Sequence, residues 1–149
     1  MDEKATSAGP QNAASPLSSS DEHTWAMLAH LSVFLNLITG FLGPVAALVI
    51  YLTYRDRSKY VAYHALQSAI FQLIWWVGGG LLVAAMWIVS ISLAVVLIGL
   101  LCLPLACLIS PLPLVSIVFG VVGAVQTSQG LDFSYWLVGD WVRGTLEES

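Results

Sequence analysis

Four polar side chains stand in an otherwise apolar stretch of the sequence: His64, Gln67, Ser68 and Gln72. Their spacing predicts that all four lie on one face of a helix. If this helix lies in a membrane, each polar group needs a partner, so the face points at protein or at water. Two interpretations remain. The face lines a polar groove in the inner leaflet, or it forms hydrogen bonds between helices.

A second candidate is the pair His30 and His64, because two histidines on facing helices can ligate haem or chlorophyll. Histidines close to a helix start more often form hydrogen bonds within the protein or lie at the interface. Cys102 and Cys107 lie in an apolar stretch without a metal-binding spacing. We therefore expect these residues to serve packing, with no metal and no cofactor.

Catalytic residues are not expected. All Asp and Glu residues lie outside the apolar regions, so no carboxylate is available there to relay protons or bind a cation. The sequence has no phosphate-binding loop and no serine elbow. A net charge of −4 gives no basic surface for nucleic acid. We expect neither an enzyme nor a protein with a soluble substrate.

The composition predicts an integral membrane protein. Of 149 residues, 58% are hydrophobic and 9% are charged, where soluble domains carry about a quarter charged residues. No charged residue lies between Lys59 and Asp132. As helix, this stretch would be about 110 Å long, against about 30 Å of hydrocarbon. We expect an all-α, polytopic helical bundle in which the lipid bilayer is the first partner.

Pro, Gly and Ser residues divide the chain into predicted elements. Residues 1–20 are polar and predict a disordered tail, and Ser19 with Glu22 suggests a capping box. Ser90 to Ser92 predicts a turn, and Pro111 and Pro113 should bend the last segment. The predicted membrane domain covers 21–131, with helices at about 24–39, 44–54, 60–89 and 93–128.

The basic residues predict the topology. Two hairpins would place all five Lys and Arg residues on the cytoplasmic side, with both termini, in a bacterial inner membrane. A rival arrangement makes residues 24–54 one span and breaks the next helix at Gly78 to Gly80. The number of full spans, from three to five, stays open.

Two further segments are candidates for the membrane surface. Arg55, Arg57 and Lys59 stand beside tyrosines and either bind lipid headgroups or merely fix the orientation. Residues 132–149 predict an interfacial amphipathic tail, or a tail packed over the bundle. Its apolar stripe recurs at helical spacing in Phe133, Trp136, Leu137 and Trp141.

Several short motifs resemble a known family. These are Ala29-His30-Leu31, Gly43-Pro44, the segment from His64 to Phe71-Gln72, and Gly130 with Tyr135. They resemble small bacterial membrane proteins of the domain of unknown function forty-eight-seventy, which are related to Tic-twenty-like chloroplast proteins. The resemblance implies a four-helix membrane fold and, by distant analogy, a place in protein import.

The function predicted from the sequence is a membrane role without catalysis. We expect an accessory or scaffold subunit that packs against other membrane proteins or against copies of itself. A translocon- or transporter-like protein with a polar inner-leaflet groove is the alternative. A haem- or chlorophyll-binding subunit is the third possibility.

Overall fold

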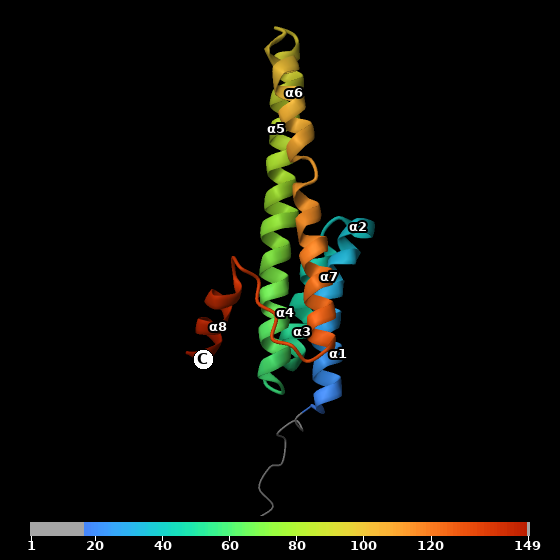
Figure 1. The fold of residues 1–149 in the computed structure, drawn as a ribbon. Helices are drawn as coiled ribbons and strands as arrows, with labels where there is room; N and C mark the ends of the chain where they lie inside the picture. The colour runs from blue at the N-terminus through green and yellow to red at the C-terminus, as the bar shows by residue number, and fades with distance from the viewer. Residues whose placement is uncertain (1–16, 149) are drawn as a thin grey trace, which may run out of the picture.

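The computed structural model describes residues 17–148, and its regular elements in that range are all helical (Figure 1). Two short hairpin arms come first: α1 (Ser19–Leu31) with η1 (Ser32–Phe34) and α2 (Leu35–Thr39), then α3 (Leu42–Tyr54). A long rod follows, formed by α4 (Lys59–Gln72), η2 (Leu73–Gly78) and α5 (Gly79–Ala94). The returning rod is formed by α6 (Ile98–Ile109), η3 (Leu112–Leu114) and α7 (Val115–Ser128), and α8 (Gly139–Glu147) ends the described chain.

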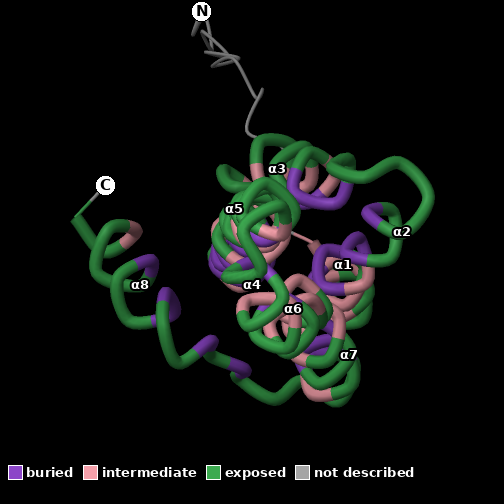
Figure 2. Tube along the Cα trace, turned by 90° about the horizontal axis from the view of Figure 1, so that it is seen from above, coloured by how far each residue is buried: buried purple, intermediate pink, exposed green. Residues whose placement is uncertain are grey.

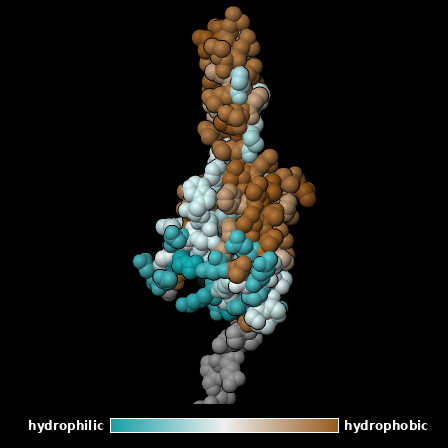
Figure 3. All heavy atoms as spheres, in the orientation of Figure 1, coloured by the Kyte–Doolittle hydropathy of each residue, from teal (hydrophilic) through white to brown (hydrophobic). Residues whose placement is uncertain are grey.

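The helices form a bundle at one end and a bare hairpin at the other. α1 packs against α4 and α7, and α3 packs against α4, whereas α5 and α6 pack mainly along each other (Figure 1). Buried residues therefore concentrate in the bundle (Figure 2). Charged side chains gather at the bundle end, while the α5–α6 hairpin is apolar almost throughout (Figure 3).

Two helical stretches are long and apolar enough to cross a membrane, Lys59–Ala94 with 36 residues and Ile98–Ser128 with 31. Leu42–Tyr54 is a shorter apolar helix. The first stretch is about 54 Å long at the ordinary helical rise, against about 30 Å of hydrocarbon. The stretch is therefore longer than one crossing of the hydrocarbon requires. Both rods are irregular where η2 and η3 meet, which is where bending costs least.

The helix starts differ from those predicted. Ser18, not Ser19, caps α1 by accepting a hydrogen bond from the Asp21 backbone N–H at 3.2 Å. The helix therefore begins at Ser19, inside the tail predicted to be disordered, whose residues 1–16 lie outside the described range. The second helix begins at Leu42 rather than at residue 44, because Thr39 Oγ1 accepts from the Leu42 N–H.

The turn predicted at Ser90 to Ser92 is wrong, because α5 continues to Ala94. Ser90 Oγ donates to the Met86 carbonyl at 2.8 Å, which satisfies the hydroxyl inside the helix. The turn comes at residues 95–97, where Leu97 has a φ of +63°. The rival break at the three glycines is wrong too, since η2 passes into α5 there. The predicted interruption at Pro111 and Pro113 is confirmed by η3.

Gly99 closes the hairpin, and its replacement is our first prediction. A Cβ at Gly99 would overlap the Ser90 carbonyl and lie 2.6 Å from the Leu93 carbonyl carbon, both of them backbone atoms. We expect Gly99→Ala to lower the free energy of unfolding by about 1–3 kcal/mol or more, because neither helix can yield easily. Thermal unfolding in detergent measures this. Gly80→Ala is the control, since its Cβ would meet nothing within 4 Å, and equal losses in both variants would contradict the close approach.

Candidate functional site

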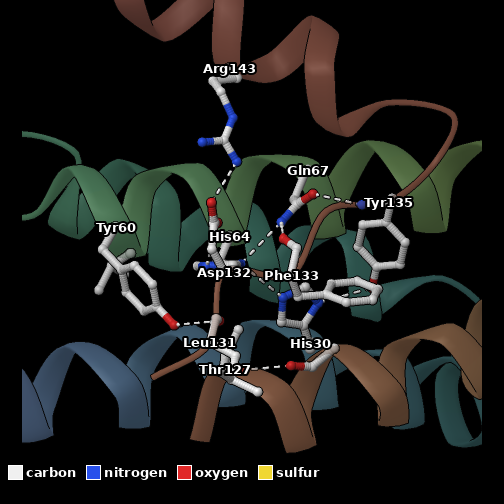
Figure 4. Close-up of polar contacts among 12 residues, drawn as sticks. His30, Tyr60, His64, Gln67, Thr127, Leu131, Asp132, Phe133, Tyr135 and Arg143 are labelled. Atoms are coloured by element: carbon white, nitrogen blue, oxygen red, sulfur yellow. Dashed lines mark hydrogen bonds and ion pairs between the residues drawn. The ribbon is translucent and has the colours of Figure 1, made fainter. Parts of the chain in front are cut away.

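The polar face of α4 is covered by protein. His64, Gln67, Ser68 and Gln72 are all buried, with at most 1% of their surface exposed. The first hairpin covers one side. Residues 131–138, an irregular segment that we call the C-terminal strap, cover the other (Figure 4). The face therefore lies in the interior of the bundle and lines no open groove.

Gln67 holds the strap through its side-chain amide. Its Nε2 donates to the Phe133 carbonyl at 2.8 Å, and its Oε1 accepts from the Tyr135 N–H at 3.1 Å (Figure 4). The amide thus pairs with the backbone of an irregular segment as a neighbouring strand would. Phe71 adds an apolar contact, because its ring stacks on Tyr135 at a centroid distance of 4.0 Å.

A directed series of hydrogen bonds joins the two histidines. The second N–H of the Gln67 amide donates to His64 Nδ1 at 3.0 Å, so that nitrogen is the acceptor and the His64 proton sits on Nε2. His30 Nε2 lies 3.4 Å from the same Nδ1 and is therefore the donor of that contact. His30 Nδ1 then accepts from the Tyr135 hydroxyl at 2.9 Å, and burial raises the pKa of this phenol above its ordinary value.

The series ends at an ion pair on the bundle surface. His64 Nε2 makes no hydrogen bond in the described structure, and the nearest anionic atom is Asp132 Oδ1 at 3.8 Å. The other carboxylate oxygen of Asp132 accepts from Arg143 Nη2 at 2.8 Å (Figure 4). This hydrogen bond raises the pKa of Arg143, whose guanidinium also lies 4.6 Å from the centre of the Tyr63 ring. The ion pair links α8 to the strap.

Gln72 forms a second buried centre, which faces the first hairpin. Its Nε2 donates to Ser32 Oγ and to Ser68 Oγ, each at 3.0 Å. Its Oε1 accepts from Asn36 Nδ2 at 3.3 Å. Asn36 Oδ1 in turn accepts from the Gly43 N–H at 2.8 Å, which joins both arms of the first hairpin to α4.

This arrangement is suited to holding helices together and offers no ligand position between the histidines. His30 Nδ1 and His64 Nδ1 already accept hydrogen bonds, and the remaining ring nitrogens carry protons. Haem or chlorophyll ligation would require at least one of these bonds to break. Among the described residues, no group of three or more His, Cys, Asp or Glu side chains could hold a metal ion.

The predicted stripe in the tail is not helical before Gly139, so its residues do not share one face. Phe133 is buried against the bundle with 7% of its surface exposed. Trp136 and Trp141 remain 66% and 64% exposed, and Leu137 is 46% exposed. The stripe fails because buried bonds to Gln67 hold the strap in an irregular conformation.

The predicted basic loop lies at the charged end, away from the buried network. Arg55 and Lys59 are exposed, and Arg55 Nε lies 3.6 Å from Asp56 Oδ2. The Arg57 guanidinium lies 5.6 Å from the centre of the Tyr54 ring. These cations form no single site with His64.

Several residues of the network were not predicted from the sequence. For Ser32 and Asn36 the sequence offers one indication of a buried contact, because polar groups four residues apart in an apolar segment need a partner. Asp132 and Arg143 gave none, since charges eleven residues apart in a tail have no predictable geometry. Tyr135 was noticed within a motif, but nothing indicated its contact with His30.

Tyr135→Phe tests the hydrogen bond to His30. The variant keeps the stacked ring but leaves His30 Nδ1 without its donor, so we expect a loss of about 1–3 kcal/mol in the free energy of unfolding. Tyr51→Phe is the matched control, because no hydrogen bond of its hydroxyl is found in the described chain. Thermal unfolding of both variants in detergent gives the comparison. An unchanged midpoint for Tyr135→Phe would show that the contact contributes nothing.

The comparisons with known proteins change the family suggested by the sequence motifs. No curated protein and no solved structure is detectably similar to the chain. One family model matches residues 21–142, which include both long apolar helices and the strap, and it describes magnetosome proteins. The predicted resemblance to the domain of unknown function forty-eight-seventy and to Tic-twenty-like proteins is therefore wrong. The chain is a membrane protein that belongs to the MamF/MmsF family, the magnetosome magnetite crystal formation protein family.

Proposed function

We propose that this chain is a non-catalytic accessory subunit of magnetite formation that works by packing against other membrane proteins. The observation that carries the proposal is the family match over residues 21–142. The use of the buried polar groups supports it as well. The hydrogen bonds of Gln67 and Gln72 hold helices and strap together, which suits a scaffold better than a transport path.

The alternative of a translocon or transporter loses its main support. It depended on a polar groove along α4, and that face is filled by His30, Ser32 and Asn36 on one side and by the strap on the other. A pigment-binding role loses support as well, because both nitrogens of His30 and Nδ1 of His64 bond to other protein groups. We therefore propose only the scaffold role.

We place both termini on the cytoplasmic side of the membrane. The charges of α1, of the loop after α3 and of α8 all lie at one end of the molecule (Figure 3). A reporter enzyme that is active only in the cytoplasm, fused after Ser149, should be active. Activity of a periplasmic reporter at the same position would contradict this orientation.

The partner-facing surface in this proposal includes the exposed tryptophans of the strap and α8. Trp136 and Trp141 are large, exposed and next to the charged end, where they contact either the lipid interface or another subunit. In a magnetosome-forming strain that lacks the gene, the wild-type chain should restore magnetite crystal size. The double variant Trp136→Ala with Trp141→Ala should restore it incompletely at equal protein level. Normal crystals without the gene would contradict the proposed role.

A further inference from the structure

A groove lies between the start of α4 and α8, at the charged end of the molecule. Lys59, Tyr60 and Tyr63 line it from α4, and Asp132, Arg143 and Glu147 line it from the strap and α8. Its volume is about 460 Å³. The groove adjoins the surface end of the buried network, because Asp132 and Arg143 border both.

The groove carries both signs of charge, and one charge of each sign is free. Arg143 and Asp132 are paired with each other at 2.8 Å. Lys59 and Glu147 form no ion pair or side-chain hydrogen bond within residues 17–148. A ligand that satisfied both would carry a negative and a positive group close together. A purely anionic ligand would meet the carboxylates of Asp132 and Glu147.

Two tyrosines form part of the wall of the groove, and their hydroxyl groups have different surroundings. The Tyr63 hydroxyl is buried and makes no hydrogen bond in the described structure, although such groups ordinarily have a partner. Tyr60 differs, because its hydroxyl donates to the Leu131 carbonyl at 3.1 Å. Neither hydroxyl is open to a ligand, because the Tyr63 hydroxyl has no accessible surface and lies beneath Gly139 beside Arg143.

The position of the groove indicates the source of that ligand. The groove lies at the charged end of the bundle, and two tyrosines, whose rings favour the depth of lipid headgroups, line it. Exposed Trp136 of the strap lies 6.4 Å from Trp75 of η2 between ring centroids, farther along the rod than the groove. A headgroup in the groove would thus leave apolar surface available for its acyl chains.

We propose that this groove binds the zwitterionic headgroup of an aminophospholipid, a phosphate ester of ethanolamine. Lys59 takes the phosphate, and Glu147 takes the ammonium group. The Arg143–Asp132 pair forms the wall and stays intact. This site is independent of the scaffold role proposed above.

The test is native mass spectrometry of the full chain in detergent, with phosphatidylethanolamine and phosphatidylglycerol of the same acyl chains added in equal amounts. We expect one phosphatidylethanolamine to be retained in preference to phosphatidylglycerol. Lys59→Gln and Glu147→Gln should each reduce this retention about fivefold, as the loss of one charge at a membrane surface predicts. These side chains are exposed, and unchanged thermal unfolding verifies that the variants fold.

Two matched controls come from the same end of the chain. Arg55 lines a neighbouring groove, which shares Lys59 and Leu146 with this one, and Glu148 lines neither. Because neither Arg55 nor Glu148 lines the proposed site, Arg55→Gln and Glu148→Gln should leave retention unchanged. Equal or preferred retention of phosphatidylglycerol would overturn the proposal, as would an effect of Lys59→Gln without one of Glu147→Gln. Displacement by equimolar soluble phosphoethanolamine would show a small-molecule site, and would overturn the assignment to lipid.

Discussion

Gln67→Leu is expected to release the C-terminal strap from the bundle. The substitution keeps the side-chain size but removes the donor to the Phe133 carbonyl and the acceptor of the Tyr135 N–H. Both backbone groups are buried with these partners, so the expected loss is about 2–5 kcal/mol in the free energy that holds the strap. Hydrogen exchange measures this directly, because the amides of residues 131–138 should exchange faster by orders of magnitude while α3 stays protected.

The control for this variant is Gln129→Leu. Gln129 is exposed at the end of α7, and no hydrogen bond of its side chain is found in the described residues. Gln129→Leu therefore introduces the same apolar side chain without removing a hydrogen bond. If the two variants exchange alike, the strap is held by the rings of Phe133 and Tyr135 and not by the amide of Gln67.

The second large effect is expected from Gly43→Ala, at the tightest contact of the first hairpin. A Cβ at this position would lie 2.6 and 2.7 Å from the two side-chain amide atoms of Asn36 and would also overlap Gln72. Asn36 would have to move, and its bonds to the Gly43 N–H and to Gln72 would break. We expect a loss of about 3 kcal/mol in the free energy of unfolding, from overpacking and unsatisfied polar groups together.

In the Gly43→Ala variant, the distance distribution between spin labels on α2 and α4 should become broader for the same reason. Gly144→Ala is the matched control, because its Cβ would meet nothing within 4 Å. Equal stability and equal distances in both variants would mean that the first hairpin does not depend on this contact. The account of Gln72 as a buried centre would then be wrong.

The polar face of α4 was predictable because it follows a simple periodicity. His64, Gln67, Ser68 and Gln72 share one helix face, and a face with four polar groups needs partners in an apolar surrounding. The strap was not predictable, because its bonds to Gln67 come from backbone groups that leave no mark on the sequence. Phe133 was assigned to a helical stripe for that reason, whereas its side chain is buried in the bundle.

The errors in the helix boundaries have a common physical origin. Ser90 donates to the Met86 carbonyl of its own helix, so its hydroxyl is satisfied there and does not end α5. Proline has no such option, and the interruption at Pro111 and Pro113 was predicted correctly. The turn at Leu97 depends on the close approach of Gly99 to α5, a tertiary contact that no local pattern reveals.

The central claim is that this member of the MamF/MmsF family works in the membrane by packing against other proteins. The most direct measurement is mild-detergent purification of the tagged chain from magnetosome membranes, followed by mass determination and identification of what remains bound. We predict a complex that contains at least one other membrane protein. The double variant Trp136→Ala with Trp141→Ala should yield less of this complex. A chain that purifies alone and as a monomer would contradict this role. Normal magnetite crystals in cells that lack the chain would contradict it as well.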